Sequence, residues 1–261
     1  VAAAAPATRP RPRDRPRATG AAAAPALGPG SRLLLARHAQ SANRARGQGE
    51  AASSDPGLSE RGLEQAQRLG KRLERELQGC IPGGLVVVSS PMRRCLLTIL
   101  PAVQALGLPL EDCICHGAAY EFGCAGLATP GSLPASIEGE LPFRCVGFGP
   151  RGWDYRGSSA KETEPEARLR GARLARWLLA EALPELRQRP GPPPLEQRVL
   201  LLCMHQTVLD LLIQILVDGS DQDWAYGGVR YKLQNTGLTE LFVATDGAAR
   251  VVRQNDWGHL Q

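Results

Sequence analysis

The hydrophobic positions along the chain predict strands that alternate with helices. Short, continuously apolar runs are typical of strands buried on both faces of a sheet, whereas apolar residues three or four positions apart indicate a helix with one buried face. Strands are predicted for six segments, which are 32–36, 85–89, 111–115, 199–204, 238–244 and 250–253.

Four helices are predicted between these strands. The first begins after Ser59, a suitable N-cap, and ends near Gly79. Its buried face is expected to contain Leu63, Ala66, Leu69, Leu73 and Leu77. The other helices cover about 92–106, the segment after Thr163, where Thr163 and Glu166 form a capping-box pattern, and about 208–217.

This alternation favours an α/β fold, a three-layer sandwich in which helices cover both faces of a mostly parallel central sheet. We expect one domain over 31–261. Within it, residues 117–160 are rich in Gly and Pro and show no periodicity. Because a loop of that length inside a domain is usually functional, we expect this segment to cap the substrate pocket.

An Ala/Pro/Arg-rich leader at 1–30 precedes the domain, and its composition predicts disorder. It holds five arginines and one aspartate, so most of the net charge of +5 belongs to it. The chain therefore gives no indication of nucleic-acid binding. The leader is similar in composition to a transit peptide, which leaves cytoplasm, plastid and mitochondrion open as locations.

Other features of the composition exclude several classes of protein. The apolar runs are interrupted well short of 18 residues, so no membrane span is expected. Seven cysteines, an odd number in a chain of 261 residues, favour reduced thiols in an intracellular compartment. Cys113, Cys115 and His116 have no second ligand pair at zinc-finger spacing, and we expect no metal.

Three predicted strands are followed at once by cationic or titratable residues. Arg37 and His38 follow the first strand, Arg93 and Arg94 lie shortly after the second, and His205 follows the strand at 199–204. Ligands bind at the carboxyl edge of a parallel sheet, where the N-termini of helices favour anions. Two histidines and two or three arginines at this edge predict a pocket for a doubly charged phosphoryl group.

Four motifs in this order resemble those of the histidine phosphatase superfamily, the phosphoglycerate mutase-like group with an Arg-His-Gly signature. They are ARHAQS (36–41), SSPMRRC (89–95), MHQT (204–207) and NTGLTEL (235–241). DPGLSERGLEQA (55–66) is similar to the first helix of the family, and RQNDWGHL (253–260) extends the resemblance to the end of the chain. The resemblance implies a phosphoglycerate mutase-like fold from about residue 32 onward.

The resemblance also implies a mechanism. His38 would attack phosphorus and form a phosphohistidine, and Glu121 in YEFGCAG would protonate the leaving group and then assist water. The residues expected to contact the phosphoryl group are Arg37, Asn43, Arg44, Arg94, His205 and Gln206. No metal or other cofactor is required. The expected substrate is a small phosphorylated metabolite or a phosphoprotein, and the oligomeric state is not predicted.

The chain departs from the pattern of the family at several positions. Ala39 and Gln206 stand where glycine is usual, Gln40 stands where glutamate is common, and Asn43 is offset by one position. YEFGCAG replaces the Asn-Glu-Arg-His-Tyr-Gly stretch of the mutases, which favours hydrolysis. Three functions stay open: a metal-independent phosphomonoester hydrolase, which is favoured, a mutase-type phosphoryl transferase, and a phospholigand-binding protein with weakened catalysis.

Overall fold

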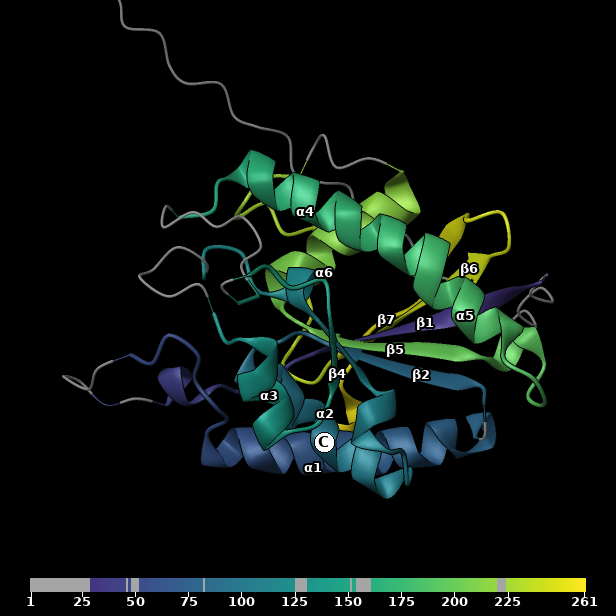
Figure 1. Cartoon of the computed structure of the whole chain (residues 1–261), viewed down its shortest axis with the longest axis horizontal. Coiled ribbons are helices and arrows are strands. Elements are labelled where there is room, and N and C mark those ends of the chain that lie inside the picture. The colour runs from purple at the N-terminus through teal and green to yellow at the C-terminus, as the bar shows by residue number, and fades with distance from the viewer. Residues whose placement is uncertain are drawn as a thin grey trace, which may run out of the picture.

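The computed structural model describes residues 29–45, 47, 52–81, 83–124, 131–150, 152–153, 161–219 and 224–261. The predicted leader lies almost wholly outside these residues. The described chain forms a seven-stranded sheet with the order β4-β3-β2-β5-β1-β6-β7 (Figure 1). The strands are β1 (Gly30–Arg37), β2 (Leu85–Ser89), β3 (Ile114–His116), β4 (Arg144–Val146), β5 (Val199–Met204), β6 (Leu238–Ala244) and β7 (Ala249–Asp256). The first five strands are parallel, and β6 and β7 are antiparallel to their neighbours.

Helices cover both faces of this sheet, as predicted (Figure 1). One layer contains α1 (Glu60–Leu77) and α2 (Arg93–Ala105); the other contains α4 (Glu164–Trp177), α5 (Leu183–Gln188) and α6 (Gln206–Ile213). Successive side chains of β1 point to opposite faces of the sheet. Leu33 lies in the same core cluster as Leu174 of α4, and Leu34 lies in the same core cluster as Leu69 of α1. The three-layer α/β sandwich is therefore confirmed.

The predicted helix signals act as expected at two N-termini. Ser59 Oγ accepts a hydrogen bond from Gly62 N over 3.0 Å at the start of α1. At the start of α4, Thr163 N donates to Glu166 Oε2 over 2.8 Å, which is one half of the predicted capping box. These caps fix where the two helices leave the sheet edge that carries the site.

Three predictions are wrong in detail. Leu63, which is predicted to lie on the buried face of α1, is 53 % exposed. The apolar stripe of this long helix turns away from that position. The third strand starts at Ile114, since Leu110–Asp112 forms a 3₁₀ turn. The first helix ends at Leu77, and Gly79 lies inside a second 3₁₀ turn, Gln78–Cys80.

The segment 117–160 is more regular than predicted. It contains α3 (Pro134–Glu140) and β4, and β4 pairs with β3 as the outer parallel strand. Part of the predicted cap is therefore the edge of the sheet. Residues 125–130 and 154–160 of this segment lie outside the described residues.

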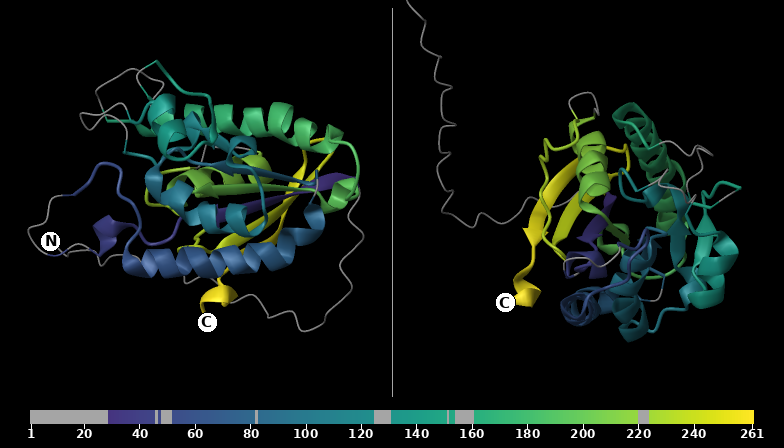
Figure 2. Two further views of the ribbon diagram at one scale, coloured as in Figure 1. Left: turned by 60° about the horizontal axis from the view of Figure 1, so that its bottom comes forward. Right: turned by 90° about the vertical axis from the view of Figure 1, so that its left-hand side faces the viewer.

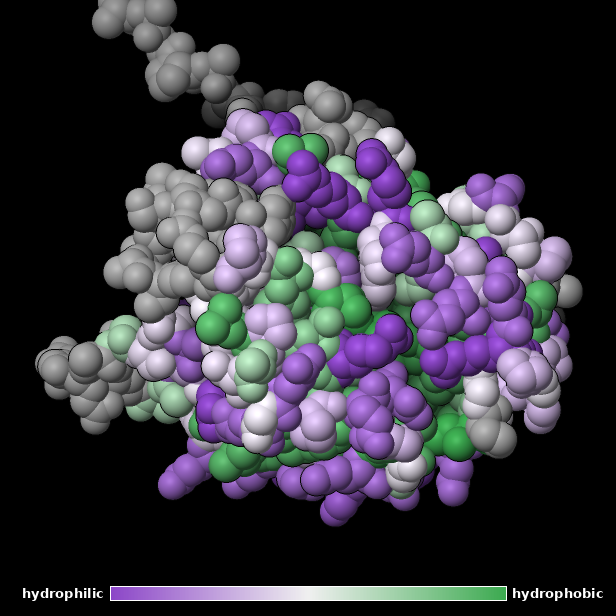
Figure 3. All heavy atoms as spheres, in the orientation of Figure 1, coloured by the Kyte–Doolittle hydropathy of each residue, from purple (hydrophilic) through white to green (hydrophobic). Residues whose placement is uncertain are grey.

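The two helical layers expose mostly hydrophilic side chains on the face shown in Figure 3. Figure 2 (right) looks onto the carboxyl edge of the sheet, where the loops after the parallel strands gather. No helix in the described part of the chain is long and apolar enough to cross a bilayer.

Two leucines of α1 provide a matched test of the helical layer. Leu69 is fully buried against the sheet, so Leu69→Ala is expected to lower the free energy of unfolding by about 2–5 kcal/mol. Leu63→Ala, on the exposed face of the same helix, should change it by less than about 0.5 kcal/mol. Urea unfolding of the two variants measures both values, and similar losses would contradict the packing of α1 described above.

Candidate active site

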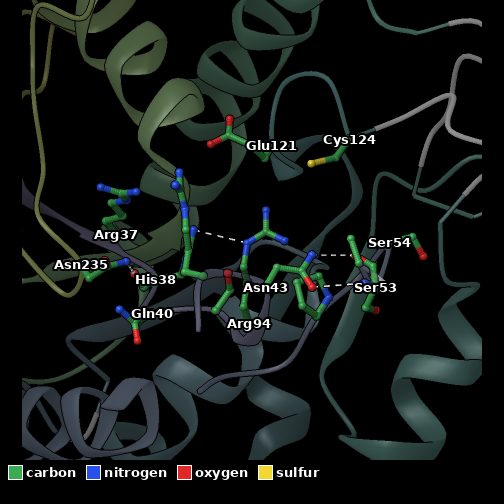
Figure 4. Close-up of a pocket in the computed structure, with 14 residues that line it drawn as sticks. Arg37, His38, Gln40, Asn43, Ser53, Ser54, Arg94, Glu121, Cys124 and Asn235 are labelled. Carbon is green, nitrogen blue, oxygen red and sulfur yellow. Dashed lines mark hydrogen bonds between the residues drawn. The ribbon is translucent and has the colours of Figure 1, made fainter. Parts of the chain in front are cut away.

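An open cavity of about 620 Å³ lies at the carboxyl edge of the sheet (Figure 4). The strand ends are held level there, since His38 N donates to Met204 O and Ser90 N donates to Cys203 O, each over 2.9 Å. The described residues that line the cavity are Arg37, His38, Gln40, Ser41, Asn43, Arg44, Ala52, Ser53, Ser54, Pro56, Arg94, Glu121, Cys124 and Asn235. Three of these are arginines and one is an acid, so the cavity attracts anions.

His38 is held with one ring nitrogen unprotonated, as a base or nucleophile requires. Its Nδ1 lies 2.6 Å from the carbonyl oxygen of Ala39, and because a carbonyl only accepts, Nδ1 carries the proton. Nε2 then has a lone pair, which accepts from Arg94 Nε over 3.3 Å. Burial, followed by the nearby Arg94 guanidinium, lowers the pKa of His38 from 6.5 to about 3. The imidazole is therefore neutral at physiological pH.

Arg37 and Arg94 place two guanidinium groups beside this imidazole (Figure 4). Arg37 Nη1 donates to Leu233 O over 2.8 Å, while its buried Nε has no hydrogen-bond partner among the described residues. Burial lowers the pKa of Arg37 below its usual value, so an anion that restores hydrogen bonds to this cation is favoured. Both arginines are where the strand-end pattern predicts them.

Glu121 faces the same cavity, above the Arg94 guanidinium in the view of Figure 4. Its Oε1 accepts from Phe122 N over 2.8 Å, and its Oε2 accepts from Thr207 N over 3.3 Å, in the first turn of α6. Burial raises the pKa of this carboxyl above its usual 4.5. A carboxyl group that keeps its proton to higher pH is suited to donate it to a leaving oxygen.

His205 lies next to His38, with 5.1 Å between the ring centroids, but it does not line the cavity. Its ring is fully buried and its Nε2 lies 2.7 Å from Ser90 Oγ. Burial, then the charge of Arg94, lowers its pKa well below 6.5. This geometry places His205 behind the nucleophile candidate; its predicted contact with phosphoryl oxygens stays a prediction.

Gln206, which is predicted to contact phosphate, is hydrogen-bonded elsewhere in this structure, and its contact with phosphate stays a prediction. Its Nε2 donates to Tyr231 O over 2.9 Å and its Oε1 accepts from Leu233 N over 2.8 Å, so both ends of the amide are used outside the cavity. Gln206 instead holds the segment whose Leu233 carbonyl binds Arg37.

Asn43 and Arg44, in the turn at 42–44, differ in their freedom to contact a ligand. Asn43 lines the cavity, but its amide bonds both the carbonyl and the N–H of Ser53 and thereby ties the loop together. Arg44 lines the cavity and is exposed. Of these two, Arg44 is the better candidate to reach an anion.

Two residues that hold the histidines are not among the predicted site residues. Asn235 lines the cavity and its Nδ2 donates to His38 O over 2.8 Å, while Ser90 pairs with His205. Both lie within motifs that carry the family resemblance, NTGLTEL and SSPMRRC, and that position was the only signal available for them.

Residues 33–113 match the model of the histidine phosphatase superfamily (branch 1). This segment of the chain is therefore similar to that superfamily. The match covers β1, His38 and the Arg94 helix, which agrees with the motifs at these positions. Among curated proteins, no sequence matches the chain.

Solved structures resemble this chain over most of its length. The ecdysone phosphate phosphatase of Bombix mori, in complex with tungstate, is 15 % identical with a TM-score of 0.58, and the match covers 88 % of this chain and 100 % of that one. A mycobacterial glucosyl-3-phosphoglycerate phosphatase is 22 % identical with a TM-score of 0.53, over 86 % and 98 % of the two chains. At these identities the likeness establishes the fold.

The depressed pKa of His38 predicts that the protein loses stability in mild acid. The unfolded imidazole binds a proton below about pH 6.5, whereas the folded one stays neutral to about pH 3. The free energy of unfolding therefore decreases as the pH is lowered through this window. For this group the decrease is about 1.4 kcal/mol per pH unit.

Urea unfolding of the native protein and of His38→Gln between about pH 7 and pH 4.5 measures this contribution. All other titrating groups are shared, so their contributions cancel in the comparison, and the variant should show the shallower pH dependence. Equal slopes for the two proteins would mean that His38 is not held neutral.

Proposed function

We propose that the protein is a metal-independent phosphomonoester hydrolase that acts through a phosphohistidine on His38. The observation that carries this proposal is the state of that imidazole: its Nδ1 proton is held by the Ala39 carbonyl and its Nε2 lone pair is in a cavity lined by arginines. A neutral imidazole is a nucleophile, and the surrounding positive charge brings a phosphoryl dianion to it.

The first step transfers the phosphoryl group to His38. Nε2 forms a bond to phosphorus while the ester P–O bond breaks and its electron pair goes to the leaving oxygen, which takes a proton from Glu121. Arg37 and Arg94 balance the charge on the equatorial oxygens, and the Nδ1–H···O=C bond to Ala39 stabilises the positive charge that the ring acquires.

The second step returns the enzyme to its starting state. Glu121, now a carboxylate, takes a proton from water as the water oxygen attacks phosphorus and the P–N bond breaks. The products are inorganic phosphate and neutral His38. No step in this sequence requires a metal or another cofactor.

We infer a small phosphorylated metabolite as the substrate. A cavity of about 620 Å³ lies within the range of small-molecule sites, roughly 300–1,000 Å³. Its described walls are polar, with serine, asparagine and glutamine side chains among the arginines, which suits a hydroxylated leaving group. Two neighbours of the same fold are named for phosphorylated small molecules, a glucosyl-3-phosphoglycerate and an ecdysone phosphate.

A phosphomonoester assay in the presence of a chelator tests the nucleophile. The native protein should release phosphate, and His38→Ala should lose activity by at least about 10³-fold because no phosphoenzyme forms. His259→Gln, a half-buried histidine that does not line the cavity, is the matched control and should keep full activity. Acid quenching with labelled substrate should trap an acid-labile phosphohistidine in the native protein alone.

Three results would contradict the proposal. Tungstate or phosphate binding without turnover would leave a phospholigand-binding protein, and transfer of the label to a second metabolite in place of water would leave a mutase. Activity that survives in His38→Ala would exclude His38 as the nucleophile.

The role of Glu121 predicts a dependence on the leaving group. Glu121→Gln should lower kcat/KM for an alkyl phosphate such as glycerol phosphate by about 10²–10⁴-fold, because an alkoxide needs a proton to leave. For 4-nitrophenyl phosphate, whose phenolate leaves without a proton, the loss in kcat/KM should be less than about tenfold. Equal losses on the two substrates would exclude Glu121 as the acid.

A further inference from the structure

A buried ion pair lies directly behind the segment that carries Glu121. Glu162 is 2 % exposed and Arg170 of α4 is 1 % exposed. Arg170 Nε and Nη2 each donate to one carboxylate oxygen of Glu162, both over 2.7 Å, so the pair is bidentate. Neither residue lines the cavity.

The remaining amino group of Arg170 holds the backbone next to Glu121. Arg170 Nη1 donates to Ala118 O and to Tyr120 O, each over 2.8 Å. The Tyr120 hydroxyl in turn donates to Glu162 Oε1 over 3.1 Å, and the guanidinium carbon lies 3.8 Å from the centroid of the Tyr120 ring. The backbone of residues 118–120 is thereby fixed from one side by a single guanidinium.

The same helix layer holds the carboxylate of Glu121 itself. Thr207 N, in the first turn of α6, donates to Glu121 Oε2. At Gly171, the residue after Arg170, an added Cβ would lie only 2.6 Å from a side-chain atom of Leu211 in α6. Helices α4 and α6 therefore pack closely where Arg170 of α4 binds the backbone of residues 118–120 and Thr207 of α6 binds the Glu121 carboxylate.

We propose that Arg170 and Glu162 are positioning residues for the general acid Glu121. This inference rests on the proposed function. The arginine fork supplies donors in a fixed plane, which allows it to bind a carboxylate and two carbonyl oxygens together; a lysine ammonium, with three rotatable donors, cannot reproduce this geometry. Glu162 neutralises and orients the buried guanidinium, so that the pair adds no net charge beside the site.

The loss of a positioning residue affects the two substrates differently, whereas a loss of stability affects both alike. A displaced Glu121 would fail to protonate the leaving oxygen, which matters for an alkoxide and hardly matters for a nitrophenolate. Loss of folded protein would reduce the turnover of both substrates equally. The ratio of the two kcat/KM values therefore separates positioning from folding.

The test compares glycerol phosphate with 4-nitrophenyl phosphate in the native protein and in Arg170→Lys. We expect kcat/KM to fall about 10–100-fold for glycerol phosphate and by less than about threefold for 4-nitrophenyl phosphate. Arg198→Lys is the matched control. Arg198 is also buried and donates to several backbone carbonyls, among them Pro193 O and Leu186 O, but it precedes β5 at the opposite edge of the sheet, so the ratio should not change.

Tyr120→Phe gives an independent measurement if Arg170→Lys does not fold. It removes one hydrogen bond to Glu162 and keeps the ring, and it should shift the ratio in the same direction by about two- to tenfold. An unchanged ratio in the folded variants would overturn the inference. Glu121→Gln distinguishes this from failure of the proposed function: if its own losses are equal on both substrates, the acid assignment fails; if only Glu121→Gln is selective, the positioning role alone fails.

Discussion

The hydrogen bond between His38 Nδ1 and the carbonyl oxygen of Ala39 determines what the site can do. At 2.6 Å it fixes the proton on Nδ1 and leaves Nε2 unprotonated, with its lone pair toward Arg94. A charged imidazolium would attract a phosphoryl dianion but could not attack it. Burial beside Arg94 prevents that outcome, since it lowers the pKa of His38 to about 3. The arginines can therefore supply positive charge for binding without removing the nucleophile.

This hydrogen bond depends on how β1 ends. His38 N donates to Met204 O of β5, and Asn235 Nδ2 donates to His38 O, so the backbone of His38 is held by β5 and by the loop that precedes β6. Ala39 N donates to Thr98 Oγ1 of α2, which orients the next peptide. The parallel pairing of β1 with β5 is thus the structural reason that the imidazole faces the cavity. The buried leucines 33–35 are followed by the polar residues Arg37 and His38 because β1 reaches the cavity at that point.

Much of this arrangement follows from the sequence by physical reasoning. Strands buried on both faces must be apolar throughout, so the runs that became β1, β2 and β5 are visible without a structure. Polar residues at the ends of parallel strands meet at one edge, which accounts for Arg37, His38 and Arg94 in one cavity.

What could not be predicted depends on side-chain direction and on contacts between distant segments. Gln206 follows His205 in the sequence, yet it points to Tyr231 and Leu233, because the loop before β6 passes beside the start of α6. In the sequence, Glu162 before α4 and Arg170 in the middle of α4 have the pattern of two solvent-exposed charges. Only the fold shows that they are buried behind Glu121. Strand β4 could not be predicted because a three-residue edge strand has no periodicity.

The departures from the family pattern follow from the backbone of the site. Ala39 contributes its N–H to Thr98 and its carbonyl to His38, and its φ is not in the left-handed region, so this position does not require glycine. The Gln40 side chain accepts from Ser59 Oγ at the start of α1, so it braces the first loop. Gln206 likewise braces the loop that orients Arg37. Each replaced residue acts on a neighbouring segment and leaves the groups around Nε2 of His38 in place, which is why these substitutions are compatible with an intact nucleophile.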